Sequence, residues 1–255
     1  MSFAQPCDTI KGNHRIGRDA KMTRGVIFDM DGVLFDTERL AVEGWKRAGQ
    51  ALGYSIPPAL MDRMRGRSVE DCRTLFEEFL GKEHPYAEAR AIRQSYVRGW
   101  IAEHGVPLKP GVRELLGYLK QTQRKVALAT SSGHEVAQRY LQSAEIKEFF
   151  DCILSGDLIE RGKPEPDIFL AAAQGLGLPP GDCIVVEDSS AGLLAAHRAG
   201  CRPVFVPDLC CVDAQTASLA VRCEGLFGVQ LLLEQEDQYL DRREPHGKNQ
   251  LGQQE

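Results

Sequence analysis

Short runs of apolar and β-branched residues alternate with longer segments of helical spacing, and this alternation constrains the fold more than any other feature. The runs are "GVIFD" at 25–29, "KVALATS" at 125–131, "CIVVED" at 183–188 and "RPVFV" at 202–206. Each is followed by a segment with apolar residues at helical spacing. Continuously apolar strands are buried on both faces, as in a parallel sheet covered by helices. The sequence therefore predicts an α/β fold with a doubly wound, Rossmann-like parallel sheet.

The interval between the first and second runs departs from this alternation, because residues 30–124 contain no convincing strand. Three segments within it have helical spacing: "TERLAVEGWKRAGQALG", "SVEDCRTLFEEFLG" and "YAEARAIRQSYVRGWIAEHG". The Gly- and Pro-containing "GVPLKPG", which follows them, is typical of a linker that returns to the core. We therefore expect a small all-helical domain, residues 37–105, inserted after the first strand. The α/β core would comprise residues 22–36 and 106–235.

The two ends of the chain carry little apolar periodicity. Met22 stands four residues before Val26 of the first strand, and we expect residues 1–21 to be a disordered extension. Residues 236–255 are polar and rich in Gln, and we expect them to form a C-terminal tail.

Composition excludes several classes of partner. The net charge of −5 offers no basic excess for nucleic acid or an anionic membrane. No run approaches the ~18 apolar residues of a membrane span, and residues 1–21 lack the apolar stretch of a signal peptide. The eight cysteines show no CxxC spacing, and several lie in apolar runs, which favours reduced thiols. We expect a cytoplasmic monomer that acts on a small molecule.

Three aspartates follow the first apolar run, in "DMDGVLFD" at 29–36. A period of two places Asp29 and Asp31 on the same side, at the carboxyl end of the strand. Open α/β sheets bind ligands at that edge, and Gly32 permits close approach of a ligand to the backbone. A polar turn that closes a core strand has a similar composition, so this motif alone leaves both interpretations open.

Hydroxyl groups end the second apolar run, where Thr130, Ser131 and Ser132 precede a helical segment. Hydroxyl and backbone N–H groups at such a helix start can bind phosphate, although the same residue types also serve simply as helix N-caps. Lys163 lies in "GKPEPDIF", where Pro164 favours an extended backbone. Taken alone, it would be an ordinary surface lysine.

A pair of acids ends the third run, in "VVEDSSAG" at 185–192. Glu187 and Asp188 repel each other unless a cation or a proton relieves the repulsion. Carboxylates together with substrate phosphate suit Mg²⁺. A carboxylate that attacks a phosphomonoester dianion also requires a cation to overcome like-charge repulsion. The four motifs together therefore predict phosphoryl transfer rather than a set of unrelated turns.

These motifs resemble those of the haloacid dehalogenase superfamily of phosphohydrolases, in which "DMDGVLFD", "LATSS", "GKPEPDIF" and "VVEDSSAG" have counterparts in the same order. The resemblance covers about residues 22–235. The helical insert is similar to the mobile cap of the branch that includes β-phosphoglucomutase and many sugar-phosphate phosphatases. The resemblance implies a Mg²⁺-dependent phosphatase that hydrolyses a small phosphomonoester through an aspartyl-phosphate.

The resemblance also implies roles for individual residues. Asp29 would be the nucleophile, and Asp31 would protonate the leaving alcohol and then deprotonate water. Asp31 also distinguishes the chain from haloalkanoate-cleaving relatives, which lack an aspartate there. Thr130, Ser131 and Lys163 would bind the phosphoryl group.

The implied metal ligands are Asp29, Asp188 and the backbone carbonyl of Asp31, with Glu187 assisting directly or through water. All of these positions match the family's motifs residue by residue. We expect Mg²⁺ at this place.

Substrate choice is expected to depend on the cap, where Arg65 and Arg67 are candidate substrate ligands. Mutase relatives carry a His and an Arg at the positions of Ala41 and Val69, so a phosphatase is favoured and a phosphomutase remains the alternative. A protein that binds a phosphorylated metabolite without turnover is a further alternative. It would have no reason to keep the complete set of acids.

Overall fold

The computed structural model describes residues 22–65, 67–209 and 211–242, so the predicted N-terminal extension lies outside the described residues. Within them, six strands form a parallel sheet in the order β3-β2-β1-β4-β5-β6. The strands are β1 (Gly25–Phe28), β2 (Lys125–Thr130), β3 (Cys152–Ser155), β4 (Cys183–Glu187), β5 (Arg202–Phe205) and β6 (Val221–Arg222). The predicted parallel sheet is confirmed. The edge strands β3 and β6 are additional; β6 has only two residues, and three of the four residues of β3 are only half-buried.

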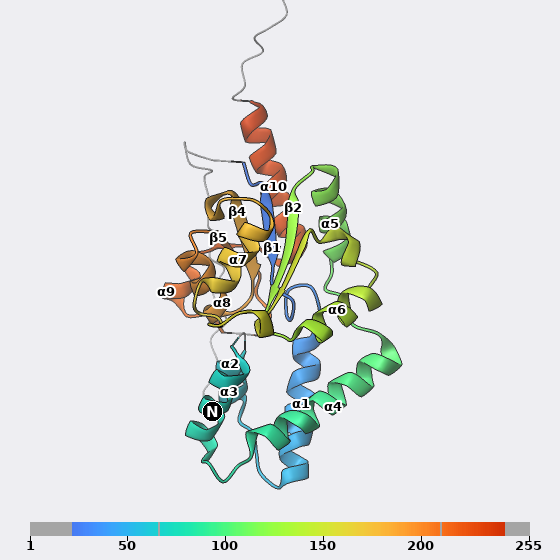
Figure 1. Ribbon diagram of the computed structural model, residues 1–255, viewed down its shortest axis with the longest axis vertical. Coiled ribbons are helices and arrows are strands. Elements are labelled where there is room, and N and C mark those ends of the chain that lie inside the picture. The colour runs from blue at the N-terminus through green and yellow to red at the C-terminus, as the bar shows by residue number, and fades with distance from the viewer. Residues whose placement is uncertain (1–21, 66, 210, 243–255) are drawn as a thin grey trace, which may run out of the picture.

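Helices cover both faces of the sheet (Figure 1). Val26 and Phe28 of β1 pack against one face, whereas Ile27, between them, packs against the other. The first face is covered by α5 (Val112–Gln121), α6 (His134–Ser143) and α10 (Gly225–Asp241). The second is covered by α7 (Asp167–Gly175) and α8 (Ser190–Arg198). A short helix, α9 (Ala214–Ala217), precedes β6. The doubly wound architecture follows from burial of both faces.

The segment between β1 and α5 forms a helical domain beside one end of the sheet (Figure 1). Its helices are α1 (Thr37–Leu52), α2 (Pro58–Met64), α3 (Val69–Leu80) and α4 (Tyr86–His104). The three predicted helices are present and α2 is additional. This domain, which we call the cap, has its own apolar core around Trp45, Phe76 and Tyr86, whose ring centroids lie 5.3–6.2 Å apart. This cluster is distinct from the two clusters of the sheet, whereas Val97 and Ile101 of α4 pack into the sheet cluster and join the cap to the core.

The two connections between core and cap run side by side. The backbone N–H of Asp36 donates to Pro107 (2.8 Å), and that of Lys109 donates to Leu34 (2.9 Å). The Lys109 ammonium also lies 3.3 Å from the Asp36 carboxylate and 2.6 Å from that of Asp208. Asp36 therefore braces the entry to the cap.

The core extends beyond residue 235, where the polar tail was expected to begin, because α10 continues to Asp241. Glu236 is buried, accepts a hydrogen bond from Thr23 (2.8 Å) and forms an ion pair with Arg202 (2.5 Å). Glu236 is therefore a core residue, because both of its buried carboxylate oxygens have polar partners. Residues 243–255 lie outside the described part of the chain.

Two further expectations concern the chain as a whole. The six cysteines that the structure describes are free, as predicted, and four of them are buried. None of the described helices combines the length and the apolar character that crossing a membrane requires.

Candidate active site

The parallel sheet brings the ends of its central strands to one edge. Phe28 at the end of β1 pairs with Leu128 of β2 and Val186 of β4, so the residues that follow meet there. Between this edge and the cap lies a cavity of about 370 Å³. Its wall includes the predicted site residues Asp29, Asp31, Thr130, Ser131 and Asp188 and the cap residues Arg65 and Arg67. The predicted residues Lys163 and Glu187 are buried beside Asp29.

Lys163 joins two of the predicted acids. Its ammonium donates to Asp29 Oδ1 (2.5 Å), to Glu187 Oε1 (2.7 Å) and to the Ala129 carbonyl (3.1 Å). Burial raises the pKa of Asp29 to about 7, against the opposing effect of Lys163. Burial also disfavours the Lys163 cation, but Asp29 and Glu187 together raise its pKa above the usual value. The site therefore holds a permanent cation directly against the predicted nucleophile.

Glu187 is fully engaged by the protein. While Oε1 accepts from Lys163, Oε2 accepts from the backbone N–H groups of Asp188 and Ser189 and from the Ser189 hydroxyl, each at 3.0 Å. The Ser189 hydroxyl oxygen accepts from the Gly192 N–H (3.1 Å) and so caps α8. Both carboxylate oxygens thus position Lys163 and the start of α8. Sequence reasoning placed Glu187 near a metal and missed this positioning role.

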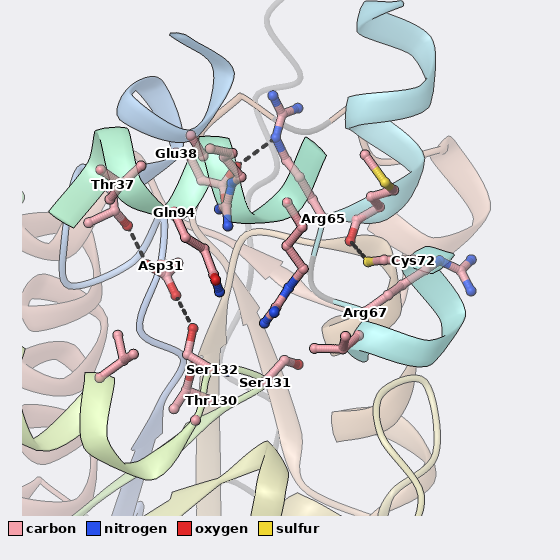
Figure 2. A pocket seen from close by; sticks show the side chains of 18 of the residues that line it. Asp31, Thr37, Glu38, Arg65, Arg67, Cys72, Gln94, Thr130, Ser131 and Ser132 are labelled. Carbon is pink, nitrogen blue, oxygen red and sulfur yellow. Dashed lines mark hydrogen bonds and ion pairs between the residues drawn. The ribbon is translucent and has the colours of Figure 1, made fainter. Parts of the chain in front are cut away.

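The carboxylate of Asp31 is held between core and cap (Figure 2). The Thr37 hydroxyl donates to Oδ1, and the Ser132 hydroxyl donates to Oδ2 (2.9 Å). Since Thr37 is the first residue of α1, the orientation of Asp31 is coupled to the start of the cap. This role of Thr37 was not predicted, because nothing in its spacing along the chain links it to Asp31.

The loop from β2 into α6 presents hydroxyl groups to the cavity. The Thr130 hydroxyl oxygen accepts from the Ser132 N–H (3.0 Å), which leaves its hydrogen able to donate to a ligand. The His134 N–H, at the helix start, donates to Asp157 at 3.0 Å. The helix N-terminus predicted to bind phosphate is therefore partly satisfied by the protein. Thr130 and Ser131 remain on the cavity wall.

Asp188 provides the test of whether these residues suit a metal ion. Its carboxylate lies against Gly32, where any Cβ would overlap it. Burial, followed by the charges of Glu187 and Asp29, raises the pKa of Asp188 well above its usual range. No three His, Cys, Asp or Glu side chains within residues 22–65, 67–209 and 211–242 are grouped to hold a metal. The predicted set needs only two carboxylates with a backbone carbonyl and substrate oxygens, so the residues present fit Mg²⁺.

The two arginines predicted to bind substrate differ in their surroundings. Arg65 forms ion pairs with Glu38 (2.9 Å) and Asp62, and its Nη1 donates to the Leu209 carbonyl of the core (3.2 Å). Its guanidinium therefore links cap to core. Arg67 also lines the cavity (Figure 2).

Four other cap residues on the cavity wall bear on specificity. Ala41 and Val69, the positions that depart from the mutase pattern, both line it. Sequence reasoning missed Arg93 and Gln94 of α4, and Figure 2 shows Gln94 extending from the cap into the cavity. The arginines of the predicted segment 86–105 indicated a basic helix. Which side of α4 faces the cavity depends on its packing against α1, which the sequence does not show.

Comparisons with known proteins agree with this geometry. A family model described as haloacid dehalogenase-like hydrolase matches residues 23–200. The chain is 36% identical over 191 residues to a probable pseudouridine-5'-phosphatase of Drosophila melanogaster, covering 71% of this chain and 80% of the relative. It is 33% identical over 181 residues to a phosphorylated carbohydrates phosphatase of Thermotoga maritima, covering 71% and 83%. The structure of β-phosphoglucomutase from Clostridium difficile superposes with a TM-score of 0.70 at 25% identity, covering 87% of this chain and 100% of that one.

Proposed function

The chain belongs to the haloacid dehalogenase-like hydrolases and is a phosphoric monoester hydrolase, and we propose that it hydrolyses a small sugar phosphate or similar metabolite through an aspartyl-phosphate on Asp29. The observation that carries this proposal is the contact between the Asp29 carboxylate and the buried Lys163, beside a cavity that Asp31 also lines. The reaction would take place in the cytoplasm, where free cysteines stay reduced.

In the first half-reaction, an Asp29 oxygen attacks phosphorus and the bond from phosphorus to the leaving oxygen breaks. Lys163 holds Asp29 in place, and the Thr130 hydroxyl donates to a phosphoryl oxygen. Protonated Asp31 gives its proton to the departing alkoxide, so the alcohol leaves neutral. Mg²⁺, held by Asp29, Asp188 and the Asp31 carbonyl, would offset the negative charge of the phosphate and the carboxylates.

In the second half-reaction, Asp31 is a carboxylate and takes a proton from water as the water oxygen attacks phosphorus. The bond from Asp29 to phosphorus breaks, which restores Asp29 and releases inorganic phosphate. The hydroxyl groups of Thr37 and Ser132 contact the two side-chain oxygens of Asp31 and keep the side chain in place for both steps. The two half-reactions use the same residue first as acid and then as base.

A phosphomutase would have to pass the phosphoryl group to a second substrate hydroxyl instead of water. The aliphatic side chains of Ala41 and Val69 line the cavity and can neither accept a proton nor bind an anion. This observation favours the phosphatase. The mutase is tested by supplying β-glucose 1-phosphate with a bisphosphate activator and measuring glucose 6-phosphate.

Release of phosphate from p-nitrophenyl phosphate tests the proposal directly. We expect turnover with Mg²⁺, loss with a chelator and recovery when Mg²⁺ is returned. The Asp29→Asn variant should keep its fold, as measured by circular dichroism, and lose turnover by more than about 1,000-fold. If neither this substrate nor a panel of small phosphomonoesters is hydrolysed in a metal-dependent way, the protein is a binding protein rather than an enzyme.

A further inference from the structure

Several arginine side chains lie on the cap wall of the cavity, among apolar and aromatic residues. The cap arginines that line it are Arg65, Arg67, Arg90, Arg93 and Arg98. Arg65 is engaged by Glu38 and Asp62, whereas within the described ranges none of the other four forms an ion pair with a carboxylate. The acids Asp29 and Asp188, in contrast, belong to the core wall. Glu38 also lies on the cap wall and Arg139 on the core wall, but the arginines outnumber the acids on the cap side, so the cavity is polarised with its positive side opposite the phosphoryl site.

Arg93 is the arginine whose surroundings are most clearly built for a ligand. Its side chain is half-buried, and its buried Nε has no hydrogen-bond partner in the part of the chain that the structure describes. The guanidinium carbon lies 5.5 Å from the centre of the Trp45 ring, which gives the group an aromatic platform. A Cβ at Gly44 would lie 3.0 Å from Arg93 Cγ and 3.1 Å from its carbonyl oxygen, so glycine there leaves room for this side chain. Helices α1 and α4 together thus fix Arg93 at the cavity.

The Glu38 carboxylate interacts electrostatically with Arg93, and it also accepts a hydrogen bond from Arg65. Burial and Asp31 raise the pKa of Glu38, whereas Arg93 and Arg65 act in the opposite direction. The Glu38 Oε2 atom accepts from Arg65 Nε at 2.9 Å. Glu38 therefore offsets the charge of both arginines, but among the described residues it accepts a hydrogen bond from Arg65 and none from Arg93, so the Arg93 guanidinium keeps its donors for another acceptor.

A bound phosphomonoester has a fixed direction in this cavity. Its phosphoryl group must lie at the core wall, next to Asp29, so its leaving group extends toward the cap. If the leaving group were an uncharged polyol, it would offer no negative charge to the cap arginines that lack an ion pair. A guanidinium matches a carboxylate or a phosphate with two parallel hydrogen bonds.

We propose that the substrate carries a second oxyanion, a carboxylate or a second phosphate, on its leaving-group side, and that Arg93 binds it. This inference rests on the phosphatase function proposed above and names the substrate class of the same site. Arg67 and Arg90 add to the positive field around that oxyanion. Arg93 thus selects phosphorylated acids and bisphosphates over phosphomonoesters whose leaving group is uncharged.

The test compares substrates that differ only in the second oxyanion. One pair is 3-phosphoglycerate and glycerol 3-phosphate, and the other is fructose 1,6-bisphosphate and fructose 1-phosphate. We expect the wild-type protein to have the higher kcat/KM for the oxyanion-bearing member of at least one pair. The Arg93→Met variant keeps an unbranched, apolar stem beside Gly44 and Trp45 and should lower the kcat/KM ratio of that pair by about 10- to 100-fold. Arg93→Lys, which keeps the charge, should recover part of the ratio.

Arg73 provides a matched control, because it is an exposed cap arginine outside the cavity that pairs with Glu70. Arg73→Met should leave the ratio unchanged. The proposal is overturned if, in both pairs, the wild-type protein has the higher kcat/KM for the member without the second oxyanion. It is also overturned if Arg93→Met lowers kcat/KM equally for the two members.

A binding measurement separates failure of this inference from failure of the phosphatase function. Calorimetric titration of the Asp29→Asn variant with each member needs no turnover. Tighter binding of the oxyanion-bearing member, lost on adding Arg93→Met, supports the role of Arg93 even if no substrate is hydrolysed. Equal binding of both members refutes that role even if p-nitrophenyl phosphate is hydrolysed. Thermal unfolding of each variant checks that the fold is retained.

Discussion

Replacing Gly192 by alanine tests the positioning of Lys163 through Glu187. Gly192 lies in the first turn of α8, and a Cβ there would overlap the Glu187 carboxylate. Glu187 has no exposed surface, and its oxygens accept hydrogen bonds from Lys163 and from the start of α8. The carboxylate therefore cannot move aside without losing these partners.

Two effects of opposite sign decide the magnitude. Alanine is favoured over glycine inside a helix by about 1 kcal/mol. Separating the buried Glu187 from Lys163 costs about 3–5 kcal/mol, because charged groups then remain buried without their partners. The net loss in the free energy of unfolding is about 2–4 kcal/mol. For a chain of this size this lowers Tm by about 4–16 °C.

The assay is urea unfolding followed by circular dichroism, with phosphatase turnover measured on the folded protein. Gly117→Ala is the matched control, since Gly117 lies inside α5 and a Cβ there would meet no neighbouring atom within 4 Å. It should leave stability unchanged or raise it by up to about 1 kcal/mol. Gly192→Ala should also lower kcat, because Lys163 then loses one of the acceptors that place it against Asp29.

A double variant distinguishes the overlap with Glu187 from a general effect on α8. In a Glu187→Ala background the overlap is gone, so adding Gly192→Ala should cause no further loss of stability. If Gly192→Ala alone is as stable and as active as the wild-type protein, Glu187 is not held as the hydrogen bonds indicate, and the reasoning is wrong.

Two further variants test other contacts of the site. Asp31→Ala should slow both formation and hydrolysis of the aspartyl-phosphate, and rapid single-turnover kinetics in either step would contradict its role as acid and base. Arg65→Ala should lower the free energy of unfolding by about 1.5–3 kcal/mol, because the partly buried Glu38 then loses its ion-pair partner. Unchanged stability with a raised KM would instead identify Arg65 as a substrate ligand.

Helices and strands were predicted correctly where a segment had a continuous apolar run or a long helical pattern of apolar residues. The four strands with continuous apolar runs were predicted, and β1, β2 and β4 each contribute residues to both apolar clusters. The edge strands β3 and β6 were not predicted: β6 has only two residues, and three of the four residues of β3 are only half-buried. Helix α2 was missed because it spans only seven residues.

The extent of α10 shows where local composition misleads. Residues 236–241 look like part of a polar tail, yet Glu236 is buried against Thr23 and Arg202. These partners are more than thirty residues away along the chain, and one belongs to the segment before β1. Only the folded chain places an acid beside both, so composition could not identify it as a core residue.

The sequence by itself determined which chemistry gathers at the sheet edge. Asp29, Thr130 and Asp188 each follow or end a buried strand, and a parallel sheet brings such ends together whatever the loops do. The tertiary structure decided how these groups are held and what faces them. Glu187 turned out to hold Lys163, Thr37 to hold Asp31, and Arg93 to reach the cavity from α4. Those contacts depend on side-chain direction and on the packing of the cap against the core, which spacing along the chain does not encode.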